Sequence, residues 1–130
     1  MEDQKTNITT PRRNASLIQF KKLADKMLVR YKPPSVKEWS ILMGYQYNYF
    51  RARYAVVSRE SPGQVLRKAK MQWIIDYMSQ NPDATAYAAA LDLNYPTAGA
   101  LGKFLKQNYD MTFRELRKHI LHANPNYDKT

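Results

Sequence analysis

An internal repeat constrains the fold of this chain more than any other feature of its sequence. At an offset of 50 residues, rising to 51 after one inserted residue, the same order of inward positions, turn residue and capping residue returns. The matched pairs are Val36 with Ala86, Trp39 with Ala89, Ser40 with Ala90, Met43 with Leu93, Gly44-Tyr45 with Asn94-Tyr95, Phe50 with Leu101, Tyr54 with Leu105, and Ser61-Pro62 with Thr112-Phe113. Few of these pairs are identical, so what repeats is the spacing of inward, turn and capping positions. This spacing predicts two copies of one supersecondary unit.

The first copy reads as two helices around a tight turn. Ser35 is the expected N-cap of a helix over 36–43, and Gly44 ends that helix because glycine adopts a positive φ without strain. The next helix has the inward stripe Tyr47, Phe50, Tyr54 and Val57. Helix, glycine turn and a helix with a polar, basic outer face are the sequence form of a helix-turn-helix unit.

The second copy follows the same order. Asp83 or Thr85 caps its first helix, and Asn94, which tolerates the left-handed conformation, stands where Gly44 stood. Thr112 caps a last helix that runs through Ile120. The inward positions of the first two helices of this copy are Ala86, Ala89, Ala90, Leu93, Leu101 and Leu105.

Two longer helices complete the pattern. The first begins at an N-cap, Asn14 or Ser16, and ends at Pro33-Pro34. Its inward stripe is Leu17, Phe20, Ala24, Met27 and Tyr31. The second begins with Ser61-Pro62 and runs to Gln80. It carries apolar residues on more than one side, as expected of a connector between two packed bodies.

These elements predict an all-α fold of about seven helices, with two helix-turn-helix subdomains joined by a long linker helix. The expected subdomains are 14–61 and 81–122, the linker helix is 62–80, and flexible tails cover 1–13 and 123–130. A linker of roughly 18 residues is about 27 Å long, comparable with the ~34 Å between neighbouring major-groove entries on one DNA face.

The charge of the chain favours a polyanionic partner. Lys and Arg number 21 against 11 Asp and Glu, for a net charge of +10 and a pI near 9.8. Such an excess attracts nucleic acid first and an anionic membrane surface second. The chain has no cysteine, which excludes thiol catalysis and Cys-ligated zinc. No apolar run reaches the ~18 residues of a membrane span, and the N-terminus lacks a secretory pattern. We therefore expect a cytoplasmic, nucleoid-associated protein and no membrane partner.

The outer face of the helix after Gly44 holds the best candidates for reading bases. Arg pairs with guanine, and Asn or Gln pairs with adenine, through two hydrogen bonds in the major groove. Tyr47 fits either the core or a thymine methyl group. The predicted base-reading residues are Gln46, Tyr47, Asn48, Arg51 and Ala52. The predicted contacts to the DNA backbone are Arg53, Arg59, Lys68, Thr97, Lys103, Lys106 and Arg114.

Over about 17–120, the sequence resembles the DNA-binding domain of AraC/XylS-type transcription regulators. The resemblance is carried by the stretch 35–45 followed by Tyr49-Phe50, Tyr54 and Ser61-Pro62, and again by 93–95, Leu101, Leu105 and 110–113. It implies seven helices, two helix-turn-helix units and a linker helix. It also implies transcription activation, usually by helping RNA polymerase at a promoter.

The chain departs from the family pattern in both units. Ala52 stands where the family usually has Arg, with Arg51 and Arg53 on either side. In the second unit, Asn94 replaces the usual Gly and Phe113 the usual Pro. The expected second reading helix, 97–103, is nearly bare of side chains, so it cannot make bidentate base contacts. The second unit therefore grips the DNA backbone or its shape, or has lost DNA binding.

Two functions from different classes remain open. The first is a sequence-specific regulator that binds double-stranded DNA, with RNA polymerase as a further partner. The second is a basic helical adaptor that binds an acidic protein partner. An enzyme is not expected, because the sequence holds no phosphate-binding loop and no catalytic triad pattern, and His119 with His122 makes a thin metal site. We expect no cofactor, and no small-molecule effector because no sensing domain is present. The sequence leaves the oligomeric state open and favours a monomer.

Overall fold

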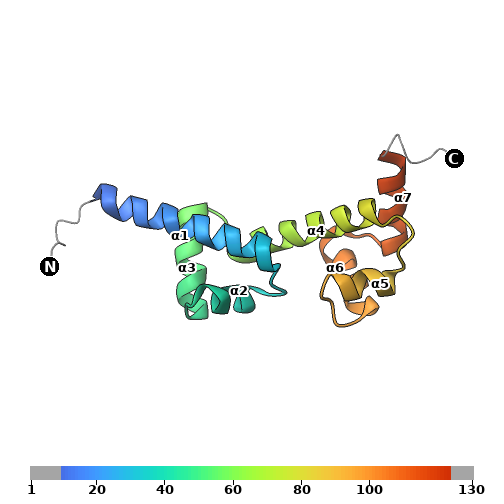
Figure 1. The fold of residues 1–130 in the computed structure, drawn as a ribbon, viewed down its shortest axis with the longest axis horizontal. Helices are drawn as coiled ribbons and strands as arrows, with labels where there is room; N and C mark the ends of the chain where they lie inside the picture. Colours follow the sequence, from blue (N-terminus) through green and yellow to red (C-terminus); the bar gives the residue numbers. More distant parts are fainter. Residues whose placement is uncertain (1–9, 124–130) are drawn as a thin grey trace. The chain divides into compact units, whose positions relative to one another are not determined.

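The prolines, caps and left-handed residues of the chain divide it into helices where the sequence predicts them. The structure is a computed structural model that describes the backbone of residues 10–123 and the side chains of residues 16–123. This part of the chain contains seven helices and no strand, so the prediction of an all-α fold is confirmed (Figure 1). The helices are α1 (Thr10–Tyr31), α2 (Val36–Met43), α3 (Tyr47–Ser58), α4 (Pro62–Gln80), α5 (Ala86–Asp92), α6 (Ala98–Tyr109) and α7 (Phe113–Ala123).

The chain separates into two compact units, Met1–Leu66 and Arg67–Thr130. The division falls inside α4, which the sequence predicts as a separate linker helix over 62–80. Leu66 of α4 is buried on the first-unit side of this division, whereas Ile74 and Met78 belong to the core of the second unit. The buried apolar residues of α4 are therefore divided between the two units.

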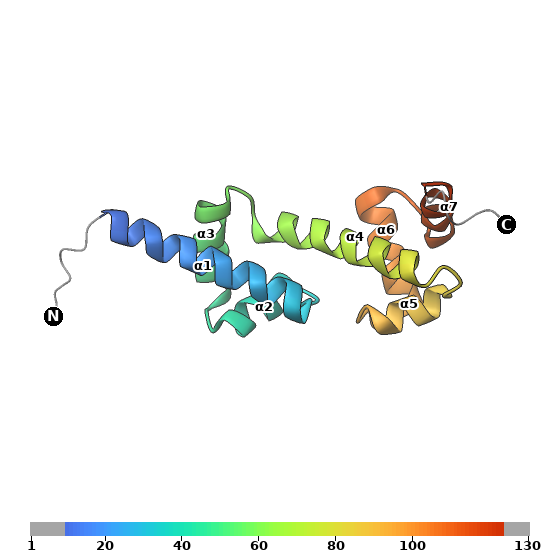
Figure 2. The same cartoon turned by 45° about the horizontal axis from the view of Figure 1, so that its top comes forward.

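The first unit packs α1, α2 and α3 around Trp39 (Figure 2). The Trp39 ring is fully buried, with its centre 5.1 Å from that of Phe50 and 5.0 Å from that of Tyr54. Its Nε1–H donates a hydrogen bond of 2.9 Å to the carbonyl oxygen of Ala24, so the one polar atom of the ring is satisfied. The hydroxyl of Tyr54 donates to Oδ1 of Asp25 at 2.8 Å and ties α3 to α1.

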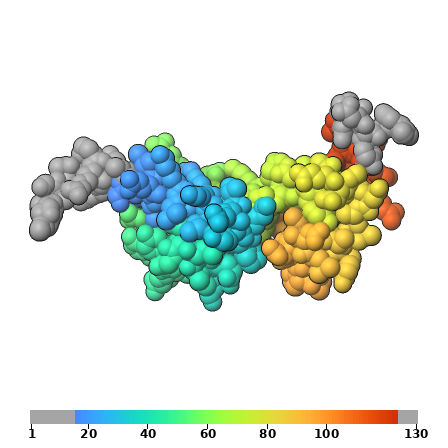
Figure 3. Space-filling model, in the orientation of Figure 1, coloured from blue at the N-terminus to red at the C-terminus, as the bar shows by residue number. Residues whose placement is uncertain are grey.

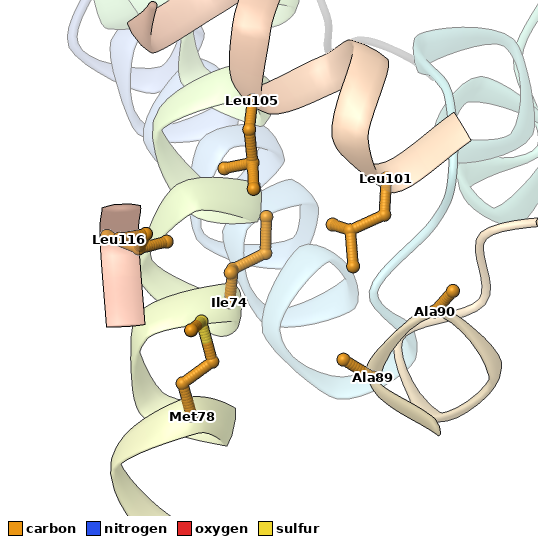
Figure 4. Close-up of a cluster of buried hydrophobic side chains, with 7 residues drawn as sticks. All are labelled: Ile74, Met78, Ala89, Ala90, Leu101, Leu105 and Leu116. Atoms are coloured by element: carbon orange, nitrogen blue, oxygen red, sulfur yellow. The ribbon is translucent and has the colours of Figure 1, made fainter. Parts of the chain in front are cut away.

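The second unit has a core of smaller side chains (Figure 4). Its buried members are Ile74, Met78, Ala89, Ala90, Leu101, Leu105 and Leu116. Here Ala89 stands at the repeat position of Trp39, and Ile74 stands at the position of Ala24. A large residue on one helix and a small one on its neighbour have exchanged places between the two units. Such an exchange keeps both cores filled, as close packing requires.

The turns of the two units share their hydrogen bonds as well as their spacing. Gly44 has a φ of 78° and Asn94 a φ of 67°, so both adopt the predicted left-handed conformation. The amide of Tyr45 donates to the carbonyl of Ser40 at 3.0 Å, and that of Tyr95 donates to Ala90 at 2.8 Å. The predicted turn residues are confirmed, and the offset of 50 residues holds at the level of single hydrogen bonds.

The helix caps repeat in the same way. Ser35 Oγ accepts from the amide of Glu38 at 3.1 Å, and Thr85 Oγ1 accepts from that of Ala88 at 3.0 Å. Thr85 is therefore the cap, and Asp83 is not. The α4 and α7 starts each form a reciprocal capping box. The boxes pair Ser61 with Gln64 and Thr112 with Glu115.

Three predictions about the first unit are wrong. The first helix begins at Thr10, not at a cap formed by Asn14 or Ser16, because Pro11 is compatible with a first helical turn. Residues 10–13 of the predicted tail are thus helical, whereas 1–9 and 124–130 lie outside the described residues. Tyr31 and Tyr47 are predicted to face inward, but Tyr31 is half exposed at the C-terminal end of α1 and Tyr47 is 42% exposed. Both sit at an end of their helix, where the neighbouring helices do not cover them.

Candidate nucleic-acid interface

Helix α3 has one fully buried side and one open side. Phe50 and Tyr54 are buried against Trp39 and Phe20, and they hold the helix on the first unit. The opposite side exposes Asn48, Arg51 and Ala52, all three predicted as base-reading residues. Gln46, the fourth, precedes the helix at its N-cap position, and its side chain is exposed and makes no cap hydrogen bond. Figure 3 shows the outer surface that α1 to α3 form on one side of the first unit.

Tyr47, the fifth predicted reader, supports Arg51 rather than the core. The Arg51 guanidinium lies over the Tyr47 ring, with Cζ 5.3 Å from the ring centre. The two residues are four apart and lie on neighbouring turns of α3. This cation–π contact holds the arginine along the edge of the exposed face. The structure thus places four of the five predicted residues on or beside one exposed face, with Gln46 at its N-terminal end.

A shallow hollow marks the C-terminal part of this face. It has a volume of about 280 Å³. Its lining residues are Asn48, Arg51, Ala52, Ala55, Ser61 and Pro62. Its apolar lining, here called the floor, consists of Ala52, Ala55 and Pro62, and its polar lining consists of Asn48, Arg51 and Ser61.

Two predicted backbone contacts in the first unit lie in different surroundings. Arg53 is half-buried, and its guanidinium lies over the rings of Phe20 and Tyr49 at 5.1 and 5.7 Å. Its Nε is buried and has no hydrogen-bond partner within the described chain. Arg59 is exposed in the left-handed conformation that ends α3, with a φ of 65°. Arg59 is therefore open to solvent, whereas much of Arg53 serves the packing of α3 on α1.

Helix α6 is the repeat equivalent of α3, and the N-terminal part of its outer surface carries only small side chains. Thr97 caps it by accepting a hydrogen bond of 2.9 Å from the amide of Ala100, so this hydroxyl has a structural role. A methyl group added at Gly102 would meet nothing within 4 Å, and one added at Gly99 would meet only Oγ1 of Thr97 at 3.6 Å. No neighbour among the described residues therefore requires glycine at either position.

The repeat register relates the two outer faces position by position. At an offset of 51 residues, Gly99 and Gly102 take the places of Asn48 and Arg51. Lys103 and Lys106 take the places of Ala52 and Ala55. Both lysines are exposed, and Nζ of Lys106 lies 3.2 Å from the Asp110 carboxylate in an exposed ion pair of little energetic weight. The long side chains and the small ones have thus exchanged positions between α3 and α6.

The remaining predicted contacts flank the second unit. Lys68 is exposed on α4, and Arg114 is exposed in the first turn of α7. Arg114 borders a hollow of about 380 Å³ that Arg117 also lines. Arg117 donates a hydrogen bond to the carbonyl of Ala84 and lies over the Phe113 ring at 5.1 Å. Arg117 therefore joins α7 to the loop before α5.

Lys70 of α4 is packed against two aromatic rings of the second unit. Its Nζ lies over the rings of Tyr95 and Phe104 at 5.7 and 5.6 Å. Burial lowers the pKa of this amine and raises the pKa of Tyr95 to about 12. Lys70 stands at the repeat position of Phe20 and Phe104 at that of Arg53. Each unit thus packs one cation against aromatic rings at this place, but from a different helix.

Exposed apolar side chains add features that inward-stripe reasoning missed. Val56 and Tyr49 are exposed on α3, beside the base-reading candidates, and Tyr87 and Leu91 are exposed four residues apart on α5. A helical-wheel comparison with the buried Ala89 places both Tyr87 and Leu91 on the side of α5 that faces away from the core.

The described residues hold no metal-binding cluster of three or more His, Cys, Asp or Glu side chains. No helix among them combines the length and apolar character that crossing a bilayer demands. Comparison of the chain with protein-family models, with curated proteins and with solved structures finds no match. The interpretation of this surface therefore rests on its own residues and geometry.

Proposed function

We propose that this protein is a transcription regulator that binds double-stranded DNA sequence-specifically, with α3 entering the major groove. The observation that carries the proposal is the two-sided character of α3. On its inner side, Phe50 and Tyr54 are buried in the core of the first unit. On its outer side, Asn48 and Arg51 are exposed to solvent. These side-chain types discriminate adenine and guanine through their major-groove edges.

The second unit has the complementary role in this proposal and mainly grips the DNA backbone. Its outer face offers Lys103 and Lys106 as point charges, and glycines stand at the places of the two base-reading candidates Asn48 and Arg51. The hydroxyl of Thr97 already caps α6. In this proposal, contact with the DNA backbone therefore depends on Lys103 and Lys106, together with the flanking cations Lys68 and Arg114. A net charge of +10 supplies the salt-dependent attraction that such binding needs.

The test is in-vitro selection of duplex DNA from a random library by the purified full chain. The selected duplex and a scrambled one are then titrated at several salt concentrations. The proposal expects a preferred sequence whose advantage survives near-physiological salt. Binding that ignores sequence and disappears as salt rises would contradict it.

A protein-binding adaptor is the second candidate, and one observation favours it. Tyr87 and Leu91 form an exposed apolar pair on α5, with 67% and 57% of their surfaces open. Apolar side chains exposed together on one helix suit a protein partner. Replacement of both by Ser would abolish the adaptor's binding, whereas sequence-specific DNA binding through α3 would persist.

A further inference from the structure

The middle of the α3 outer face is small and apolar. Ala52 is exposed there, and its neighbours one helical turn away are Asn48 and Tyr49 on the N-terminal side and Ala55 and Val56 on the C-terminal side. A methyl group at the centre of a helix face lets the helix backbone approach a flat surface more closely than a long side chain would.

Ala52 also separates two hollows in the surface of the first unit. The hollow of about 280 Å³ has Ala52, Ala55 and Pro62 as its apolar lining and Asn48, Arg51 and Ser61 as its polar lining. The hollow of about 260 Å³ on the other side is lined by Leu17, Tyr49, Ala52, Arg53 and Val56. The first hollow thus combines an apolar floor with two side chains that can read bases.

From this arrangement we infer that the first hollow receives the 5-methyl group of a thymine, held against Ala52 and Ala55. The inference rests on the proposed function, because it requires α3 to lie in the major groove. Thymine is the one base that presents an apolar group there. The other bases present a hydrogen-bonding group or, in cytosine, a bare C–H at this edge, so none of them fills the space beside Ala52 and Ala55 as a methyl group does.

The side chains beside the floor of the hollow determine which base pairs lie next to this thymine. Asn48 and Arg51 lie one turn before Ala52 and Ala55 respectively, so they flank the floor from the same side. The thymine is therefore expected next to the base pairs that these two side chains contact, within one run of the recognised site.

The experiment uses the duplex selected by the full chain and replaces its thymines one at a time with deoxyuridine. This change removes one methyl group and leaves the pairing and the other groove groups intact. At one position, uracil should lower the affinity about four-fold, which corresponds to the roughly 0.8 kcal/mol of one buried methyl-sized group. At the other positions, the affinity should stay close to that of the parent duplex.

Two variants identify the residue that contacts the methyl group. In Ala52→Gly, the affinity ratio of thymine to uracil at the sensitive position should fall towards one. Val56→Ala, a change on the same helix that borders only the other hollow, should leave the ratio unchanged. Thermal denaturation of both variants checks that they remain folded. If Ala52→Gly does not fold, the titration of the deoxyuridine-substituted duplexes with the unmodified protein still tests the thymine contact.

Each outcome decides the inference. Retained sequence preference without any uracil-sensitive position overturns the thymine contact and leaves the proposed function standing. A ratio that Val56→Ala abolishes and Ala52→Gly preserves moves the methyl group to the other hollow and also overturns it. Loss of all sequence preference in the parent protein removes the proposed function together with this inference.

Discussion

The guanidinium of Arg51 lies over the ring of Tyr47, with 5.3 Å between Cζ and the ring centre. Tyr47 is 42% exposed, so the contact sits at the surface of α3 and not in the core. A cation–π contact at such a site contributes about 0.5–1 kcal/mol and narrows the range of arginine conformations. A side chain that is ordered before binding loses less entropy when it meets its target.

Arg51→Ala should remove preference at one base position. The expected loss is about 1–3 kcal/mol at that position, since a bidentate pair with guanine disappears. Arg51→Lys keeps the charge but not the planar fork, so it should retain general affinity and still lose the preference. Binding constants for duplexes altered at each position measure both effects. If Arg51→Ala leaves the preference unchanged, the outer side of α3 is not the reading face.

Lys103→Ala should weaken binding to all sequences alike. A lysine that neutralises one phosphate contributes about one unit to the slope of log affinity against log salt, so the slope should fall by about one. Lys106→Ala should act in the same direction. Gln107→Ala is the matched control, because it truncates an exposed, uncharged neighbour on α6. A slope unaffected by either lysine change would show that α6 does not lie against the DNA backbone.

Gly99→Ala and Gly102→Ala should each raise the free energy of unfolding by about 1 kcal/mol. The added methyl groups meet open space or an ordinary contact, and alanine has the better helix propensity. Gly44→Ala is the contrasting variant and should be destabilising, because Gly44 has a φ of 78°. Urea denaturation measures all three. Weaker DNA binding by the stabilised glycine variants would identify α6 as a surface of close approach.

Tyr54→Phe and Tyr95→Phe should differ although both hydroxyls lie inside the protein. Tyr54 donates to Asp25 at 2.8 Å, so its loss should cost about 1 kcal/mol. The Tyr95 hydroxyl is buried and has no hydrogen-bond partner within the described chain. Tyr95→Phe should therefore leave the free energy of unfolding unchanged or raise it. Equal losses in the two variants would mean that Tyr95 has a partner in solution.

The stability of the protein should fall as the pH rises from 10 to about 12. Burial, followed by the charge of Tyr109, raises the pKa of Tyr95 to about 12, and burial together with the Asp25 hydrogen bond raises that of Tyr54 further. In this range the unfolded chain releases protons that the folded chain keeps, so deprotonation favours unfolding.

Lys70 acts in the opposite sense, because burial lowers its pKa and the unfolded chain holds that proton more firmly. Both the wild type and Tyr95→Phe contain Lys70, so its contribution cancels in the difference between their free energies of unfolding. Urea denaturation across the range should show a smaller decline in the variant. An identical decline in both proteins would place the Tyr95 hydroxyl in contact with water.

Most helix ends, and the turns between the helices, can be predicted from the sequence. Pro33-Pro34 ends α1, Ser61-Pro62 begins α4, and Asn94 adopts the left-handed turn of Gly44, all as local backbone chemistry requires. The internal repeat can also be detected in the sequence, because the capping residue, the turn residue and the inward stripe recur in the same order although few of the matched residues are identical. Helical periodicity was enough to place Asn48 and Arg51 opposite Phe50.

The environment of residues at the edge of an inward stripe depends on how the helices pack against one another. Periodicity assigns a side to each residue, but the neighbouring helix determines how far that side is covered. Tyr47 is left open and supports Arg51, whereas Arg53 and Lys70 lay their long stems and charges against aromatic rings. Tyrosine, arginine and lysine combine an apolar body with a polar end, so either environment suits them, and only the packed neighbours select one.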